Sequence, residues 1–325
     1  MQPTVRVQAD TVTPMVYVSQ VHSNGGFVNV YPFRQKRPTM RLTAGLDNPS
    51  RIAFDPQQNV YVANDTTVCE FAPDSKKIIR TLDLGVGTHG DLTVDSNGTA
   101  YVAYNSGTAS RISIYSPGKE HPSFSITKGV TAPIAVAVDS SGYVYVANSN
   151  PSSVKVYPPG GKTPVRSLDG KFVELAAMVL DRFGDLYVAD KGDQQNGVRS
   201  KTARVFVYAP GSSKPSRVIH SGVRGPVALK VDLASNLYVG NVFVNKNSQS
   251  RGYVSVYDFR ASTPVYSTNT VDTYEILLAM DSQNNLYVGR DGKDSAISEY
   301  MPDSPRPQLR ISLGRNALQG IGAFQ

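Results

Sequence analysis

The stretch PIAVAVDSSGYVYVANSNPSSVKVYPPG, residues 133–160, decides the fold. Two apolar runs, PIAVAVD (133–139) and YVYVAN (143–148), flank a short polar turn, and a third run, SVKVYPPG (153–160), ends in Pro-Gly. Short β-branched runs bounded by Gly, Asn, Asp and Pro are typical of strands, and none of these runs has helical spacing. Together with PVRSLDG (164–170), they predict a unit of four antiparallel strands.

This unit recurs along the whole chain. The tyrosine of the YVAN element marks each copy, and successive tyrosines are 44, 40, 44, 42, 51 and 49 residues apart. The marked residues are Tyr17, Tyr61, Tyr101, Tyr145, Tyr187, Tyr238 and Tyr287. Four-stranded units that repeat about every 40 to 50 residues are typical of β-propeller blades. We therefore expect an all-β propeller with four antiparallel strands per blade.

The two ends of the chain complete one blade between them. The first copy, MVYVSQ (15–20), has no inner strand before it, and LQGIGAFQ (318–325) reads as an inner strand with nothing after it. The sequence therefore predicts a single domain of seven blades, closed by a C-terminal strand that joins the N-terminal blade. After an extension at 1–14, the predicted blades are 15–45 with 315–325, 46–85, 86–131, 132–170, 171–222, 223–271 and 272–314.

An aspartate opens the turn between the first and second strands of six units. An aspartate in this place accepts hydrogen bonds from backbone amides of its own turn. Six copies cannot be six active sites, so we interpret them as turn residues. They are Asp55, Asp95, Asp139, Asp181, Asp232 and Asp281.

One face of the ring is the natural place for a site. We call it the top face: it carries the loops that precede each inner strand and those that follow each YVAN element, including the long insertions 190–203 and 241–252. Loops on a rigid scaffold are where binding usually resides. Polar residues at these two places are the ligand-binding candidates, namely Asn64, Asp91, Asn148, Asp190, Arg224, Asn241 and Arg290.

Three further residues of the top face suit acid–base or metal chemistry. His89, Glu174 and Glu275 lie at the starts of inner strands, where other units have proline or small residues. If they converge on the mouth of the axial channel, they supply an acid/base group or ligands for a divalent cation such as Ca²⁺ or Mg²⁺. The alternative is that they are solvated rim charges paired with arginines.

The composition excludes several classes of protein. No apolar run reaches the roughly eighteen residues of a membrane-spanning helix. The single cysteine, Cys69, rules out an intrachain disulfide and a cysteine-rich metal site. The net charge is +7, but charged residues make up only 18% of the chain, so we expect solvated basic loops rather than a nucleic-acid-binding face. The start, MQPTVRVQAD, lacks the pattern of a signal peptide.

The quoted stretch resembles the repeats of NHL-type and YVTN-type propellers, whose shared pattern is P-x-G-[IV]-A-V-D-x-x-G-x-[IVL]-Y-V-A-[ND], followed after a gap by [IV]-x-V-[FY]. The resemblance covers essentially the whole chain. It implies a binding or scaffolding module, and we expect a secreted or periplasmic protein whose leader has been removed. Two enzyme branches are more distantly similar: the gluconolactonase-like metal hydrolases and the virginiamycin B lyases.

The motifs of those two enzyme branches are missing here. The E-G-P-x-W and W-F-T-E patterns both contain tryptophan, and this chain has none. Only Glu275 occupies a position near that of a lyase site residue. We therefore predict a monomeric, non-catalytic propeller that binds a protein or small molecule at its top-face loops and channel mouth. The alternative is a metal-assisted lyase or hydrolase acting at that mouth.

Overall fold

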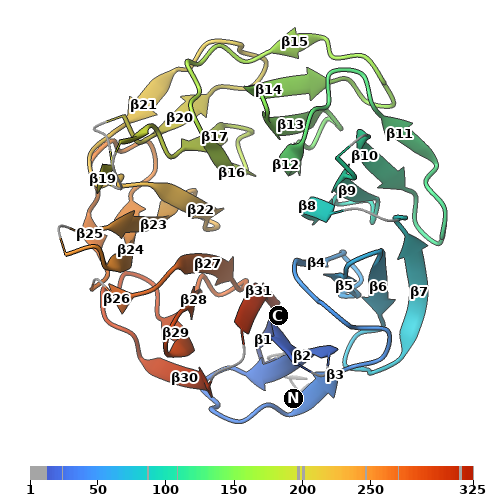
Figure 1. Ribbon diagram of the computed structural model, residues 1–325, viewed down its shortest axis with the longest axis vertical. Coiled ribbons are helices and arrows are strands. Elements are labelled where there is room, and N and C mark those ends of the chain that lie inside the picture. The colour runs from blue at the N-terminus through green and yellow to red at the C-terminus, as the bar shows by residue number, and fades with distance from the viewer. Residues whose placement is uncertain are drawn as a thin grey trace, which may run out of the picture.

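The computed structural model describes residues 13–23, 25–85, 88–107, 109–195, 198–199, 202–245, 247–269, 271–314 and 317–324, with the side chains at 88–89, 194–195, 198–199 and 324 left out. The described residues form strands and turns but no helix. Seven antiparallel sheets surround a central axis, and both ends of the chain lie in one of them (Figure 1). The predicted all-β, seven-bladed propeller is confirmed.

Each blade runs outward from the axis through four main strands. Blade 1 consists of β31 (Ala317–Phe324), β1 (Met15–His22), β2 (Gly25–Pro32) and β3 (Met40–Leu42). Blade 2 consists of β4 (Ile52–Phe54), β5 (Val60–Ala63), β6 (Thr67–Phe71) and β7 (Ile78–Asp83). Blade 3 consists of β8 (Thr88–Val94), β9 (Ala100–Asn105), β10 (Ser110–Tyr115) and β11 (Phe124–Ile126).

The remaining four blades follow the same order. Blade 4 consists of β12 (Pro133–Val138), β13 (Val144–Ser149), β14 (Ser152–Tyr157) and β15 (Arg166–Ser167). Blade 5 consists of β16 (Leu175–Leu180), β17 (Leu186–Asp190), β20 (Arg204–Tyr208) and β21 (Arg217–Ile219). Blade 6 consists of β22 (Pro226–Val231), β23 (Leu237–Val244), β24 (Ser250–Tyr257) and β25 (Tyr266–Ser267). Blade 7 consists of β27 (Glu275–Met280), β28 (Leu286–Asp291), β29 (Ser295–Tyr300) and β30 (Leu309–Gly314).

The two predicted insertions differ in structure. The first holds the short pair β18 (Gln194–Gln195) and β19 (Val198–Arg199). The second is largely strand rather than loop, because the β23–β24 ladder continues past the core as far as the pair Val244↔Ser250. The rings of Phe243 and Tyr253 meet edge to face at 5.8 Å and give this extension an apolar contact of its own. The strand β26 (Val271–Asp272) also pairs with β24.

The C-terminal strand closes the ring as predicted. β31 pairs with β1 from Met15↔Phe324 to Val21↔Ala317. Leu318 and Ile321 are buried in the core between blades 7 and 1. A hydroxyl contact ties the same blade to blade 2, since Ser19 donates a hydrogen bond to the carbonyl oxygen of Ser50 at 2.7 Å. Blade 1 is therefore held from both neighbours.

The aspartate-led turns join the marker tyrosines in one repeated motif. In blade 4, Asp139 Oδ1 accepts the backbone N–H groups of Ser141 and Tyr143, both at 2.9 Å, and Oδ2 accepts the hydroxyl of Tyr145 at 3.1 Å. The tyrosine-to-aspartate contact recurs in six blades at 3.0–3.5 Å. Blade 1 has no such aspartate, and there the ring of Tyr17 packs on Phe54. The interpretation of the six aspartates as turn residues is confirmed.

Glu299 is a buried carboxyl that forms no ion pair with another described residue. It lies on β29 opposite Tyr287 of β28, and it is 3% exposed. Its Oε2 accepts the backbone N–H of Arg34 at 3.2 Å, whereas Oε1 has no partner among the described residues. Burial raises the pKa of Glu299, although the N–H group and the charge of Arg34 act in the opposite direction.

The wild type should lose stability as the pH rises and Glu299 ionises. We expect Glu299→Gln, which cannot ionise at this position, to lack that loss. A carboxyl whose pKa is raised in the folded state contributes most below its unfolded pKa, and that contribution is lost as the pH rises through its folded pKa. The unfolding free energy of the variant minus that of the wild type should therefore be about 1 kcal/mol higher at neutral pH than in acid. Urea unfolding of both proteins across the pH range measures this. Stability curves that stay parallel at every pH would contradict it.

Candidate functional site

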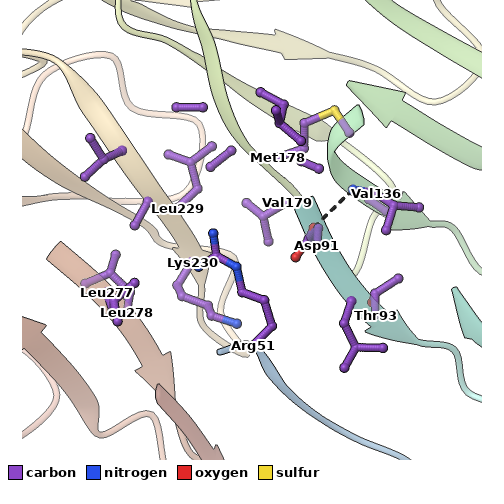
Figure 2. A pocket seen from close by; sticks show the side chains of 18 of the residues that line it. Arg51, Asp91, Thr93, Val136, Met178, Val179, Leu229, Lys230, Leu277 and Leu278 are labelled. Carbon is purple, nitrogen blue, oxygen red and sulfur yellow. Dashed lines mark hydrogen bonds between the residues drawn. The ribbon is translucent and has the colours of Figure 1, made fainter. Parts of the chain in front are cut away.

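The axial channel holds a cavity of about 390 Å³. All seven blades contribute to its wall through their innermost strands or the residue just before them. Most of the lining side chains are aliphatic, as Figure 2 shows for Met178, Val179, Leu229, Leu277 and Leu278. Although most lining residues are aliphatic, the surface that faces the lumen is more polar than apolar, so the few charged side chains count for much of it.

Strand register arranges inner-strand residues in two rings; the whole upper ring and four residues of the lower ring line the cavity. The upper ring, nearer the top face, contains the inner-strand residues that lie opposite the small residue after Tyr-Val. It consists of Arg51, Asp91, Ala135, Ala177, Ala228, Leu277 and Gly320. The lower ring contains the residues opposite the marker tyrosines. It consists of Ala53, Thr93, Ala137, Val179, Lys230, Ala279 and Gly322.

Small residues in these rings follow from the packing of the blades. Ala63 and Ala147, for example, are fully buried on the second strands. A Cβ atom on Gly240 would come within 2.8 Å of Ile276, and one on Gly289 within 2.8 Å of Leu318. The ring positions beside them take small or aliphatic residues in most blades, and the three charged exceptions are Arg51, Asp91 and Lys230.

Asp91 is fixed on the wall by the neighbouring blade. Its Oδ2 accepts the backbone N–H of Val136 on β12 at 3.0 Å (Figure 2). Gly90 permits this approach, because a Cβ atom there would lie 2.2 Å from the carbonyl oxygen of Pro133. Burial raises the pKa of Asp91, while the charges of Arg51 and Lys230 and the N–H group of Val136 act to lower it.

Arg51 and Lys230 extend into the same cavity from blades 2 and 6 (Figure 2). Within the described part of the chain, neither side chain makes a hydrogen bond or an ion pair. The Lys230 side chain is exposed to the lumen. Protein atoms packed around it still lower the pKa of Lys230, and the charge of Asp91 opposes the change.

Glu275 completes the set of charged groups that line the cavity. It begins β27 at the top face and is half-buried. Burial raises the pKa of Glu275; Arg51 acts to lower it, and the charge of Asp291 raises it further. Beside it, Tyr274 is 73% exposed and marks the top of this wall. Two cations and two carboxylates from four blades therefore face one enclosed space.

Three of the predicted ligand-binding residues serve the framework instead. The side chains of Asn64, Asn148 and Asn241 are buried, and their polar atoms bond to backbone groups of the loop before the inner strand. For example, Asn148 accepts the N–H of Thr131 at 2.9 Å and donates to the carbonyl of Gly129 at 3.0 Å. The three residues lie beside loops of the top face, but backbone groups of those loops already form hydrogen bonds with their side-chain atoms.

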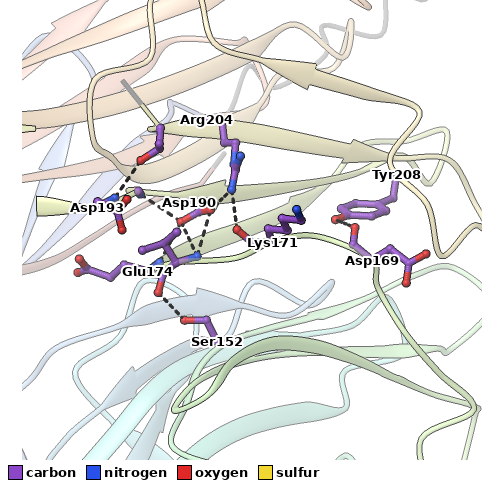
Figure 3. A network of polar contacts seen from close by, with 11 residues as sticks. Ser152, Asp169, Lys171, Glu174, Asp190, Asp193, Arg204 and Tyr208 are labelled. Atoms are coloured by element: carbon purple, nitrogen blue, oxygen red, sulfur yellow. Dashed lines mark hydrogen bonds and ion pairs between the residues drawn. The ribbon is translucent and has the colours of Figure 1, made fainter. Parts of the chain in front are cut away.

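Asp190 and Glu174 belong to a network in blade 5 (Figure 3). Asp190 is fully buried, accepts the N–H of Glu174 at 2.9 Å and forms an ion pair with Arg204 at 3.3 Å. The Glu174 carboxylate is exposed and pairs with Lys191 at 2.8 Å. Glu174 does not line the cavity that Glu275 lines. The structure therefore places these two glutamates in different surroundings, against the expectation that they converge.

The predicted metal site stays a prediction as a whole. His89 lies on β8 opposite Tyr104, but its side chain falls outside the described residues. Among the side chains that are described, no three from His, Cys, Asp or Glu are placed to hold a metal ion.

The two remaining ligand-binding candidates, Arg224 and Arg290, lie off the cavity wall. The guanidinium of Arg224 stacks on Phe243 at 3.9 Å, and Arg290 is half-buried on β28.

Sequence reasoning found Asp91 and Glu275 but overlooked the two cations as site residues. The sequence alone allows rim carboxylates to pair with arginines, of which Arg51 is one, and indicates no role for Lys230. An alignment of the units reveals Lys230 as unusual, because PVALKVD of blade 6 has lysine where PIAVAVD of blade 4 has alanine. A charged residue in a ring of small residues is a departure that framework packing does not require.

Comparisons with known proteins support the fold and no more. No protein-family model and no curated protein sequence matches the chain. Among solved structures, Kuenenia stuttgartiensis hydrazine synthase is similar with a TM-score of 0.63 at 18% identity, over 77% of this chain and 76% of that one. A Bacteroides caccae protein of unknown function is similar with a TM-score of 0.58 at 11% identity, over 96% of this chain and 98% of that one.

These likenesses agree with the seven-bladed architecture. A propeller is a scaffold on which either binding or catalysis is built, so the fold alone does not choose between them. The described residues include no helix that is long and apolar enough to pass through a membrane.

Proposed function

We propose that this protein binds a small polar molecule in its axial cavity, entered from the top face, without catalysis. The observation that carries the proposal is the pair of cationic side chains, Arg51 and Lys230, that line the cavity without a hydrogen-bonding partner in the described chain. Both side chains are exposed to the lumen, so they can form charge-assisted hydrogen bonds with a ligand that enters it. A ligand with an acidic group provides the missing partner.

The other groups of the cavity favour a ligand of mixed character. Asp91 and Glu275 offer acceptors, and the aliphatic wall offers contact to an apolar body. The lumen surface is more polar than apolar, which suits a small charged ligand better than a fully apolar one. The volume of about 390 Å³ lies at the lower end for such sites and suits a metabolite rather than a polymer. We also infer that the repeats are of the NHL or YVTN type and that the protein is secreted or periplasmic.

Thermal unfolding with a panel of small carboxylic acids and zwitterions tests this proposal. A ligand at 100 times its Kd should stabilise the wild type by about 2.7 kcal/mol. We expect Arg51→Ala to remove most of that gain. The matched control is Arg306→Ala, which removes an exposed arginine that does not line the cavity. Stabilisation that is equal in the two variants, or absent with every compound, would overturn the proposal.

A further inference from the structure

Lys230 occupies a position that differs from its counterparts in every other blade. The lower ring has alanine, threonine, valine or glycine in the other six blades. Lys230 lies opposite Tyr238, so its place in the register is the same as theirs. Blade packing does not need a lysine here, because the small residues of the other blades satisfy the same register.

The surroundings of Lys230 favour its neutral amine. The cavity wall beside it is largely aliphatic, and the charged groups that share the lumen are Arg51, Asp91 and Glu275. No hydrogen bond or ion pair within the described chain holds the ammonium group. Burial lowers the pKa of Lys230. Lys230 is exposed to the lumen that Arg51 and Asp91 also line, so its amine is accessible to a bound ligand, and the neutral amine is the nucleophile.

We propose that Lys230 is a carbonyl-reactive lysine, which forms an imine with a small oxo acid bound in the cavity. This rests on the proposed function, because the cavity must first admit the acid. Arg51 is the partner for the carboxylate of the ligand. The Lys230 amine adds to the carbonyl carbon to give a carbinolamine, which then loses water to give the imine.

Asp91 is the group placed to carry protons in that step. It is the carboxyl whose charge Lys230 senses most, and Val136 fixes it on the opposite part of the wall. On addition the nitrogen loses one proton and the former carbonyl oxygen takes one up; on dehydration the hydroxyl takes up a second proton and leaves as water, while the nitrogen loses its remaining proton to give the imine. A carboxyl with a raised pKa can donate and accept these protons. No oxidant or reductant is consumed.

Reductive trapping tests the proposal. The protein is mixed with glyoxylate and cyanoborohydride, which reduces an imine to a stable secondary amine, and the modified lysines are located by peptide mass mapping. Lys162 is exposed and serves as the reference within the same molecule. We expect labelling of Lys230 to exceed that of Lys162 by about tenfold at neutral pH, because Arg51 holds the acid beside Lys230 and raises its local concentration there. Equal labelling at the two sites would overturn the proposal.

Two variants separate reactivity from binding. Lys230→Arg removes the primary amine but leaves a cation in the lumen, so the adduct should disappear, while a smaller glyoxylate-dependent thermal shift that still requires Arg51 should remain. Arg51→Ala should lower labelling at Lys230 but leave Lys162 unchanged. A thermal shift that depends on Arg51 with no adduct at Lys230 overturns only the lysine chemistry. Selective labelling of Lys230 that survives Arg51→Ala, with no thermal shift, supports the reactive lysine and overturns the bound acid.

Discussion

Replacing Gly320 with alanine is expected to destabilise the protein by about 3 kcal/mol, at the upper end for overpacking. Gly320 lies in the closing strand β31, where a Cβ atom would come within 1.8 Å of the carbonyl oxygen of Ser50. That oxygen is backbone and also accepts the Ser19 hydroxyl, so it cannot move without breaking the contact between blades 1 and 2. One methyl group therefore opposes closure of the ring.

Urea unfolding followed by circular dichroism measures this loss. Gly292→Ala is the matched control, because a Cβ atom at that glycine finds only ordinary contacts, the nearest at 3.5 Å. The control should stay within about 0.5 kcal/mol of wild type. If Gly320→Ala were as stable as the control, the tight seating of the closing strand on blade 2 would be wrong.

Arg80→Ala is expected to cost more, about 4 kcal/mol. Arg80 and Glu70 form an ion pair in blade 2 with side chains only 6% and 7% exposed. The guanidinium also donates to the hydroxyl of Tyr61 at 2.9 Å and to the backbone carbonyls of Ser116 and Lys119 in the hairpin of blade 3. Removing it leaves a buried carboxylate without its partner, which is the expensive way to break such a pair.

A double-mutant comparison isolates that cost. In Glu70→Gln/Arg80→Ala the uncompensated charge is gone, so much of the lost stability should return. Arg251→Ala provides the exposed counterpart, because the Arg251–Asp272 pair is 2.6 Å long with side chains 31% and 74% exposed. It should cost at most about 1 kcal/mol. Equal losses for Arg80→Ala and Arg251→Ala would contradict the argument.

The fold was predictable because every unit repeats the same local chemistry. The tyrosine and the small residue after Tyr-Val mark each blade, and the aspartate that accepts the tyrosine hydroxyl marks six of the seven. The ring closure followed from an inner strand missing at residue 15 and present near residue 318. Such features depend on neighbours along the chain or on a fixed register.

The site was less predictable because it depends on contacts between blades. A polar residue at the end of a second strand, such as Asn64 or Asn148, reads equally well as a ligand group or as a bond to a nearby loop. Only the folded structure shows that backbone N–H groups of the loop donate hydrogen bonds to the side-chain oxygen. Lys230 and Arg51 lie 179 positions apart in the sequence, and the closed ring is what brings both side chains into one cavity.

The late position of β31 has a consequence for biosynthesis. Until residues 317–324 have been made, β1 presents an open row of amide and carbonyl groups beside the apolar residues Val16 and Val18. An unpaired strand edge of this kind invites pairing with another molecule. A nascent or C-terminally clipped chain should therefore depend on chaperones and aggregate readily, while the finished ring hides the same edge from its surroundings.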